Sequence, residues 1–169
     1  MSLTQGERPL DTTKPIELDY LFNAADKLYM QFARSCGVSS CAYWMLYDLV
    51  RAGGTAPLTR LCDSWSYSKQ TINSALKTLE SRELIELAFC EGSRRNKMAT
   101  LTAAGSAFAE RNIRPAMRAE ERAFDTLSDE EREALLALTR KYTDALEAEF
   151  KRMRGELEQR GSETSGEVR

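Results

Sequence analysis

The chain has 169 residues, the length of one domain with or without long additional helices. Its hydrophobic fraction of 42% and charged fraction of 30% are those of an ordinary globular protein, and its net charge of −2 excludes a general cationic coat for nucleic acid. The sequence has no histidine, which excludes histidine-based hydrolytic triads and histidine-bound zinc.

Other absent patterns narrow the class of protein further. No apolar run reaches 18 residues, and the first residues lack the charged-then-apolar pattern of a signal peptide, so we expect a cytoplasmic protein without a membrane partner. There is no phosphate-binding glycine loop, no pair of catalytic carboxylates and no C-x-x-C motif. We therefore expect neither an enzyme nor a bound metal or cofactor. The four cysteines are expected to be free thiols, as is usual in a reducing compartment.

The N-terminal part of the chain is predicted to contain two helices. Residues 1–14 include few apolar side chains and are expected to form a flexible arm. Apolar residues at helical spacing predict a helix from Ile16 to Ser35, which Gly37 ends. A second helix is predicted from Cys41 to Arg51, and its apolar residues on nearly all sides indicate burial in the middle of the domain.

The next stretch has the pattern of a helix-turn-helix. Residues 56–58 are expected to be extended, and residues 59–65 to form the first helix. A second helix is predicted over 69–81, where apolar residues recur at i, i+3, i+4 and i+7. Ser68 is suited to cap this helix, because its hydroxyl can accept an unpaired backbone N–H in the first turn.

Two short strands are predicted after this helix. Residues 84–89 and 97–102 show period-two alternation, and Gly92-Ser93 supplies the turn between them. A helix followed by a hairpin with a cationic tip is a winged helix-turn-helix, in which the helix enters the major groove of DNA. The predicted fold class is therefore mainly α with a small β-hairpin wing, extended by long helices for dimerisation.

The polar face of the 69–81 helix carries amide, hydroxyl and ammonium groups and no carboxylate before Glu80. For an isolated helix, a solvated surface would be the simpler interpretation, but the hairpin that follows favours DNA. Residues 68–102 contain six lysines and arginines, Arg82 among them, against four glutamates, a local charge of +2. Amides suit base edges and ammonium groups suit phosphates, so we expect Gln70 and Asn73 to read bases while Lys69 and Lys77 hold the backbone. The predicted DNA-binding residues are Ser68, Lys69, Gln70, Thr71, Asn73, Ser74 and Lys77 on the helix, with Arg94, Arg95 and Lys97 on the wing.

The C-terminal part is predicted to be helical. A helix is expected over 103–127, with Pro115 as an internal kink or break. Ser128 to Glu131 form a capping box for a last helix that we expect to end near Gln159, about 46 Å long at 1.5 Å per residue. Its apolar stripe is too long for one winged domain to cover, which implies a homodimer. The tail over 161–169 is expected to be disordered.

The ordered set of motifs between residues 58 and 105 resembles the MarR family, the multiple-antibiotic-resistance-type regulators. That family has a leucine-threonine start, a serine-led recognition helix, an arginine-tipped wing and a closing leucine-threonine-x-x-glycine. The resembling residues are Leu58-Thr59, Leu61, Ser68-Lys69-Gln70-Thr71-Ile72-Asn73, Leu79-Glu80, Leu84-Ile85, Arg95-Asn96-Lys97 and Leu101-Thr102-Ala103-Ala104-Gly105.

Two departures from the family pattern bear on DNA recognition. Ser93 stands where the family usually has an aspartate that holds the wing arginine, here Arg95. Ser74 stands where the recognition helix often has an arginine, which implies a different base preference.

The resemblance also suggests how the protein could be regulated. In the family, small effectors bind between the dimerisation helices and the winged domain, and some members sense peroxide through a cysteine near the start of the domain. Cys36, with Arg34 nearby in sequence, is the candidate for such a sensor, although all four cysteines could instead be small apolar fillers. Plain core packing is likewise the simpler interpretation of the aromatic residues that could line an effector pocket, which are Tyr20, Tyr29, Phe32, Trp44 and Tyr47.

The sequence therefore predicts a homodimeric, sequence-specific transcriptional regulator, a repressor, whose partners are double-stranded DNA, a second copy of itself and a small aromatic effector. The alternatives are a thiol-based redox sensor that uses Cys36 and a winged-helix module that binds a protein. The expected organisation is an arm over 1–14, a dimerisation helix over 15–36, the winged domain over 37–105, dimerisation helices over 106–160 and a tail over 161–169.

Overall fold

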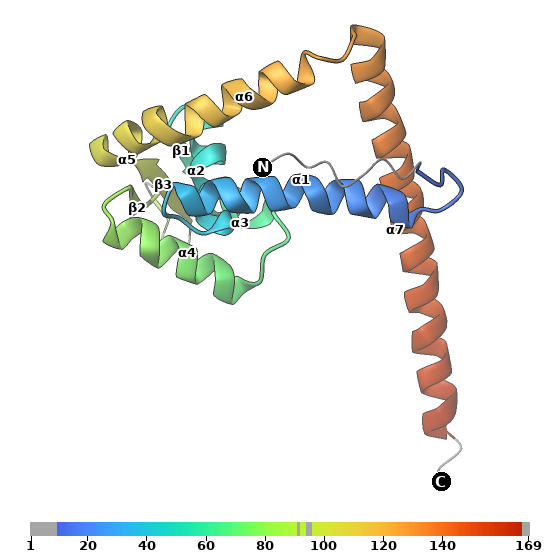
Figure 1. The fold of residues 1–169 in the computed structure, drawn as a ribbon. Helices are drawn as coiled ribbons and strands as arrows, with labels where there is room; N and C mark the ends of the chain where they lie inside the picture. Colours follow the sequence, from blue (N-terminus) through green and yellow to red (C-terminus); the bar gives the residue numbers. More distant parts are fainter. Residues whose placement is uncertain (1–9, 91, 94–95, 167–169) are drawn as a thin grey trace. The chain divides into compact units, whose positions relative to one another are not determined.

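The computed structural model describes residues 10–90, 92–93 and 96–166, with side chains as far as Gln159. The chain divides into two compact units, 1–117 and 118–169, with the boundary inside one helix. Figure 1 labels the elements of both units. The expected fold class, mainly helical with a small sheet, is confirmed.

The first unit begins with the two predicted helices. Helix α1 spans Ile16–Ser35, and Gly37 at φ +72° turns the chain toward α2, which spans Ser40–Arg51. The Ser39 hydroxyl caps α2 by accepting the Ala42 N–H at 3.2 Å. As expected from its composition, α2 is largely buried, and it contacts α1, α3, α4 and the sheet.

The helix-turn-helix consists of α3, Leu58–Asp63, and α4, Lys69–Ser81. The bounds of α4 are those predicted, and the Ser68 hydroxyl accepts the Thr71 N–H at 3.1 Å, which confirms the cap. Helix α3 starts one residue earlier and ends two residues earlier than the predicted 59–65, and Trp65 lies in the turn.

The sheet has three strands rather than the two of a simple hairpin. Strands β2, Ile85–Phe89, and β3, Lys97–Leu101, pair antiparallel, with Leu87 opposite Ala99. The stretch expected only to be extended forms β1, Thr55–Pro57, which pairs with the other edge of β3. Pro57 is tolerated because β1 is an edge strand, where a missing N–H leaves no central ladder bond unmade.

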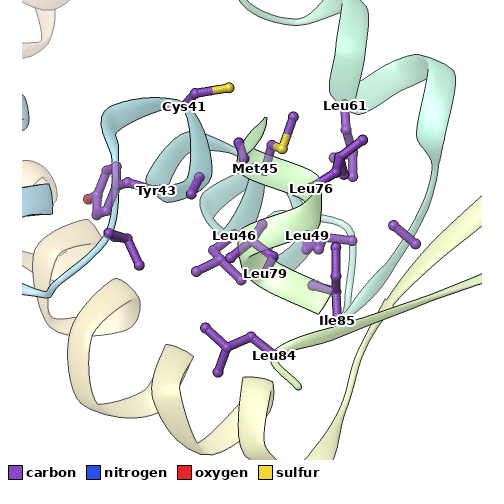
Figure 2. Close-up of a cluster of buried hydrophobic side chains, with 14 of the residues drawn as sticks. Cys41, Tyr43, Met45, Leu46, Leu49, Leu61, Leu76, Leu79, Leu84 and Ile85 are labelled. Atoms are coloured by element: carbon purple, nitrogen blue, oxygen red, sulfur yellow. The ribbon is translucent and has the colours of Figure 1, made fainter. Parts of the chain in front are cut away.

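The core lies where α2, α4 and the sheet meet, and Figure 2 shows its leucines directed toward one another. Leu46, Leu49 and Leu79 are each 0% exposed. The apolar face predicted for α4 is buried as expected, through Ile72, Ala75, Leu76 and Leu79. Burial of this face fixes which side of α4 remains available to a partner.

The link between α4 and the sheet explains the closing leucine-threonine-x-x-glycine motif. The Thr102 hydroxyl donates to the Glu83 carbonyl and accepts the Gly105 N–H, so it joins the start of β2 to the start of α5, Ala103–Phe108. A Cβ on Gly105 would lie 1.8 Å from the Leu84 carbonyl oxygen. Glycine is therefore required at position 105 because a Cβ would collide with the Leu84 carbonyl, and not because the residue has an unusual φ.

Pro115 does not break the helix, which was one of the two predicted effects. The helix continues through α5, a π-helical turn at Ala109–Ile113 labelled η1, and α6, Arg114–Phe124. In η1 the Arg114 N–H bonds to the Ala109 carbonyl, five residues back. The wider turn directly before Pro115 accommodates a residue that has no N–H to donate, so the helix is bulged instead of broken.

The second unit consists of the end of α6 and the long helix α7, Asp129–Gly166. The predicted capping box is confirmed: Ser128 Oγ accepts the Glu131 N–H at 3.2 Å, and the Glu131 carboxylate accepts the Ser128 N–H at 2.8 Å. Helix α7 continues seven residues beyond Gln159, so the tail predicted to be disordered is helical as far as Gly166. The sequence contains no proline after Pro115, and adding a residue to an existing helix needs no new nucleus.

The apolar stripe of α7 is open within this unit. Leu138, Phe150 and Leu157 are 64%, 54% and 61% exposed, and none of the described side chains from 118 to 159 is buried. Charged side chains interrupt the stripe, and no helix among the described residues is long and apolar enough to cross a bilayer.

Candidate nucleic-acid interface

The outer face of α4 presents a row of polar side chains that are not used inside the molecule. Lys69, Gln70, Asn73, Ser74 and Lys77 are exposed, and within the described residues their side chains make no hydrogen bond or ion pair. Their donors and acceptors are therefore available to an external partner. The buried opposite face orients all five outward.

Ser68 and Thr71, also predicted to bind DNA, have local roles. Their hydroxyl oxygens lie 2.8 Å apart, and Ser68 Oγ also accepts the Thr71 N–H. Both side chains thus stabilise the first turn of α4, where backbone N–H groups and the helix dipole favour an anionic group such as a phosphate.

Arg82 does not belong to the open cationic surface, although the charge count over 68–102 included it. Its guanidinium donates to the Gly37 carbonyl at 2.7 Å and lies 5.5 Å from the centre of the Phe108 ring. It therefore holds the C-terminal end of α4 against the α1–α2 turn and α5, and the charge offered to DNA is smaller than the sequence indicated.

The structure describes both strands of the wing, β2 and β3, up to its tip. Lys97 lies opposite Phe89 in the β2–β3 register, with Nζ 5.1 Å from the centre of the exposed Phe89 ring. Ser93 Oγ accepts the Asn96 N–H at 3.0 Å, so the residue that replaces the family's aspartate closes the turn instead. Arg94 and Arg95, the predicted tip cations, lie outside the described residues.

The turn before α4 is anchored by aromatic residues that the sequence interpretation did not single out. Trp65 Nε1 donates to Asp48 Oδ2 at 2.9 Å, and the two tryptophan rings, Trp44 and Trp65, stack 4.2 Å apart at 23°. Tyr67 packs against the core, and burial, with smaller effects of Cys41 and Asp26, raises the pKa of its phenol. The turn is thus held against α2 on both sides of Ser66.

Four of the five residues predicted to line an effector pocket form one aromatic cluster. Trp44 lies 4.7 Å from Tyr29 and 5.2 Å from Tyr47, and Phe32 joins the cluster through Tyr43 at 5.9 Å. Tyr20 is not brought into it: the side chain is 60% exposed and makes no ring contact with the described residues. The rings contact each other directly, as in the core-packing interpretation, and their use as an effector site stays a prediction.

The cysteines differ in burial more than the sequence suggested. Cys41 is 2% exposed, and burial, with a smaller effect of Cys62, raises the pKa of its thiol to about 11. The pKa of the Cys62 thiol is also raised, mainly by burial and to a smaller extent by the charge of Asp63, although this side chain is only half-buried. Cys36, the predicted sensor, is half-buried and packs against the core at the end of α1. Cys90 lies half-buried at the base of the wing turn, where its N–H bonds to the Asn96 carbonyl.

Asp48 and Trp65 were missed, although the sequence carried a signal for both. Asp48 is the one charged residue between Ser40 and Val50 in a helix predicted to be buried. A carboxylate in that position needs a donor, because burial of an unpaired charge is very costly. Trp65 supplies an N–H and stands in the turn next to that helix.

The chain was compared with known proteins. No protein-family model and no curated sequence matches it. Several solved structures share its fold. A MarR family regulator from Neisseria meningitidis has a TM-score of 0.69 and 24% identity, over 80% of this chain and 95% of that one.

Two further structural neighbours are regulators studied with DNA or with a small molecule. A MarR family transcriptional regulator from Streptomyces coelicolor, in complex with DNA, has a TM-score of 0.63 and 21% identity, over 84% of this chain and 92% of that one. The BpsR protein of Bordetella bronchiseptica, whose DNA binding is regulated by 6-hydroxynicotinic acid, has a TM-score of 0.55 and 21% identity, over 75% of this chain and 98% of that one. The chain therefore has the fold of the MarR family regulators, as the resemblance over residues 58–105 implied.

Proposed function

We propose that this protein is a transcriptional repressor that binds a pseudo-palindromic operator as a homodimer and is released by a small aromatic effector. The observation that carries the proposal is the outer face of α4, where five exposed polar side chains have no partner among the described residues. Amides in such a row can pair with adenine edges, while lysines can pair with phosphates. A protein with the same fold binds DNA.

Homodimerisation is supported by the exposed apolar residues of two helices. On α7 they include Leu146, Phe150, Met153 and Leu157, and on α1 they include Leu21 and Leu28. Exposed apolar area of this extent on long helices is typical of an interface between chains. A two-fold dimer would carry two copies of α4, and half-sites about 10 bp apart would then match successive turns of the major groove.

The candidate site for release by a small aromatic molecule is the cluster around Trp44, whose rings pack against one another and could repack around a planar ligand. The DNA binding of BpsR, which has a similar fold, is regulated by the aromatic compound 6-hydroxynicotinic acid, and this supports an aromatic effector for the present protein. The candidate ligand is accordingly a small planar aromatic compound.

Alanine substitutions on α4 test the proposal by fluorescence anisotropy. The probes are a labelled duplex with the DNA upstream of the protein's own gene and a scrambled duplex of the same composition. Gln70→Ala and Asn73→Ala should each lower the preference for the upstream DNA by about 5- to 100-fold, while Lys77→Ala should weaken binding to both duplexes alike.

Lys141→Ala provides the matched control, because Lys141 is an exposed lysine of α7. It should leave both affinities unchanged. Unaltered affinity in the Gln70, Asn73 and Lys77 variants would contradict the assignment of α4 as the reading helix.

A further inference from the structure

Asp48 is a buried carboxylate with a specific partner. The residue is 6% exposed on an otherwise apolar helix, and its Oδ2 accepts a hydrogen bond from Trp65 Nε1 at 2.9 Å. A carboxylate that is removed from water gains more free energy from a hydrogen-bond donor than a neutral acceptor gains. This bond therefore favours one position of the Trp65 indole over positions in solvent.

The stacking of Trp65 extends the contact to two more helices. Its ring lies 4.2 Å from Trp44 of α2 at 23°, and Trp44 in turn lies 4.7 Å from Tyr29 of α1. Trp44 and Trp65 are the two tryptophans of the chain. Aromatic contacts and one charge-assisted hydrogen bond thus connect α1, α2 and the helix-turn-helix turn.

Trp65 lies three residues before the cap of the recognition helix. The Tyr67 N–H donates to the Trp65 carbonyl at 2.7 Å, and Ser68 then receives the Thr71 N–H on its hydroxyl and the Ile72 N–H on its carbonyl. Loss of the Trp65 contacts with α2 would consequently remove a restraint on the backbone that carries this cap. Lys69 and Gln70 follow directly.

We infer that Trp65 is the positioning residue of the recognition helix: held by Asp48 and stacked on Trp44, its indole fixes the first turn of α4 for DNA. The inference rests on the proposed function and deepens it, because it names what sets the orientation of the reading face. Trp65 is half-buried and lies outside the most buried group of side chains. Its role is thus separable from core stability by experiment.

Three variants separate the hydrogen bond from general packing. Trp65→Phe retains a ring that can stack on Trp44 but removes the N–H donor. Asp48→Leu removes the acceptor, whereas Asp48→Asn retains an oxygen that can accept the indole N–H. Ile113→Val is the control, because it removes a methylene group from a fully buried side chain of η1, outside the aromatic cluster and the turn.

Hydrogen exchange of the free protein tests the positioning without DNA. Trp65→Phe and Asp48→Leu should raise exchange of the Thr71 and Ile72 amides about tenfold relative to Leu79, the loss expected for a hydrogen bond to a charged group. Asp48→Asn should stay within about threefold of the wild type, and Ile113→Val should leave the ratio unchanged. Wild-type protection of Thr71 and Ile72 in Trp65→Phe would overturn the inference, as would equal loss in Ile113→Val.

Anisotropy on the upstream duplex tests the consequence for DNA. Trp65→Phe and Asp48→Leu should bind more weakly, because only the fraction of molecules with α4 in place binds well, and a tenfold loss corresponds to about a tenth of the molecules in that state. Ile113→Val should bind like the wild type, and wild-type affinity in Trp65→Phe would overturn the inference. If the wild type itself showed no preference for the upstream DNA, the proposed function would fail, while the exchange ratio would still decide whether Trp65 positions α4.

Discussion

The two compact units of this chain use their apolar residues in opposite ways. In the first unit, α4 buries its apolar face against α2 and the sheet, and Leu79 is fully buried. In the second unit, α7 also carries an apolar stripe, yet Leu138 and Leu157 are more than 60% exposed. The first unit has a buried core, whereas the second exposes apolar side chains of the kind that the proposed homodimer would cover.

Under the proposed function, this contrast gives the two units different tasks. A helix whose apolar face is covered by its own domain is held rigidly and can present polar groups in fixed positions, which reading of DNA requires. A helix whose apolar face is open can bring two such domains together.

The same substitution, glycine to alanine, should have opposite effects in the two units. Gly105→Ala would place a Cβ 1.8 Å from the Leu84 carbonyl oxygen and should lower the free energy of unfolding by about 3 kcal/mol or more. A Cβ on Gly155 in α7 meets nothing within 4 Å, so Gly155→Ala should raise stability by about 0.5–1 kcal/mol. Urea unfolding of both variants measures the difference, and a neutral Gly105→Ala would contradict the close packing of α5 on the sheet.

A charge on the open stripe should weaken self-association. Phe150 is 54% exposed, and Phe150→Glu should weaken a dimer by about a hundredfold, roughly 3 kcal/mol, because a carboxylate would have to be buried at the interface. Sedimentation velocity at micromolar concentration measures this change. Phe89→Glu is the matched control, since Phe89 is equally exposed on the wing; equal sedimentation of the Phe150 variant and the wild type would refute the role of α7.

Burial in the first unit should protect Cys41 from alkylation. Its pKa rises from 9.0 to about 11 because burial disfavours the charged thiolate, so its thiolate fraction at neutral pH is about a hundredfold below that of an unperturbed thiol. Its reaction with a maleimide should keep accelerating as the pH rises toward 11. Peptide mapping by mass spectrometry, with glutathione as the reference thiol, measures the rate, and reaction at the reference rate at pH 7 would contradict the burial of Cys41.

The smallest expected effect concerns a strained residue between α4 and β2. Glu83 has φ +55°, the left-handed conformation that costs a residue with a Cβ about 1 kcal/mol. Glu83→Gly should therefore raise the free energy of unfolding by about 0.5–1 kcal/mol. Glu86→Gly, on the exposed face of β2, is the control and should lower it by a similar amount; a destabilising Glu83→Gly would show that this residue stabilises the turn through its side chain.

Much of the fold was predictable because local signals agreed with one another. The period of the apolar residues, the Ser68 cap and the Ser128 capping box placed α1, α4 and the start of α7 at the residues found. The alternation of 84–89 and 97–102 placed the wing strands in the same way. Pattern alone could not show that 55–57 join the sheet, because the pairing partner is more than forty residues away.

The features that the sequence did not predict depend on contacts between distant residues. Arg82 was counted as a DNA cation, but a carbonyl at Gly37, 45 positions away, receives its hydrogen bond. Trp65 and Asp48 meet across 17 positions, and each residue alone has several ordinary interpretations. The exposure of the five polar residues on the outer face of α4 was predictable, because the buried face of an amphipathic helix determines which residues lie on its outer face.

The most direct test of the central claim is fluorescence anisotropy of the wild-type protein on the DNA upstream of its own gene and on a scrambled duplex, at several salt concentrations. A protein that reads sequence through α4 should prefer the upstream DNA by at least about 1000-fold. Equal, weak and steeply salt-dependent binding to both duplexes would contradict the account, because it would indicate phosphate contacts without base reading.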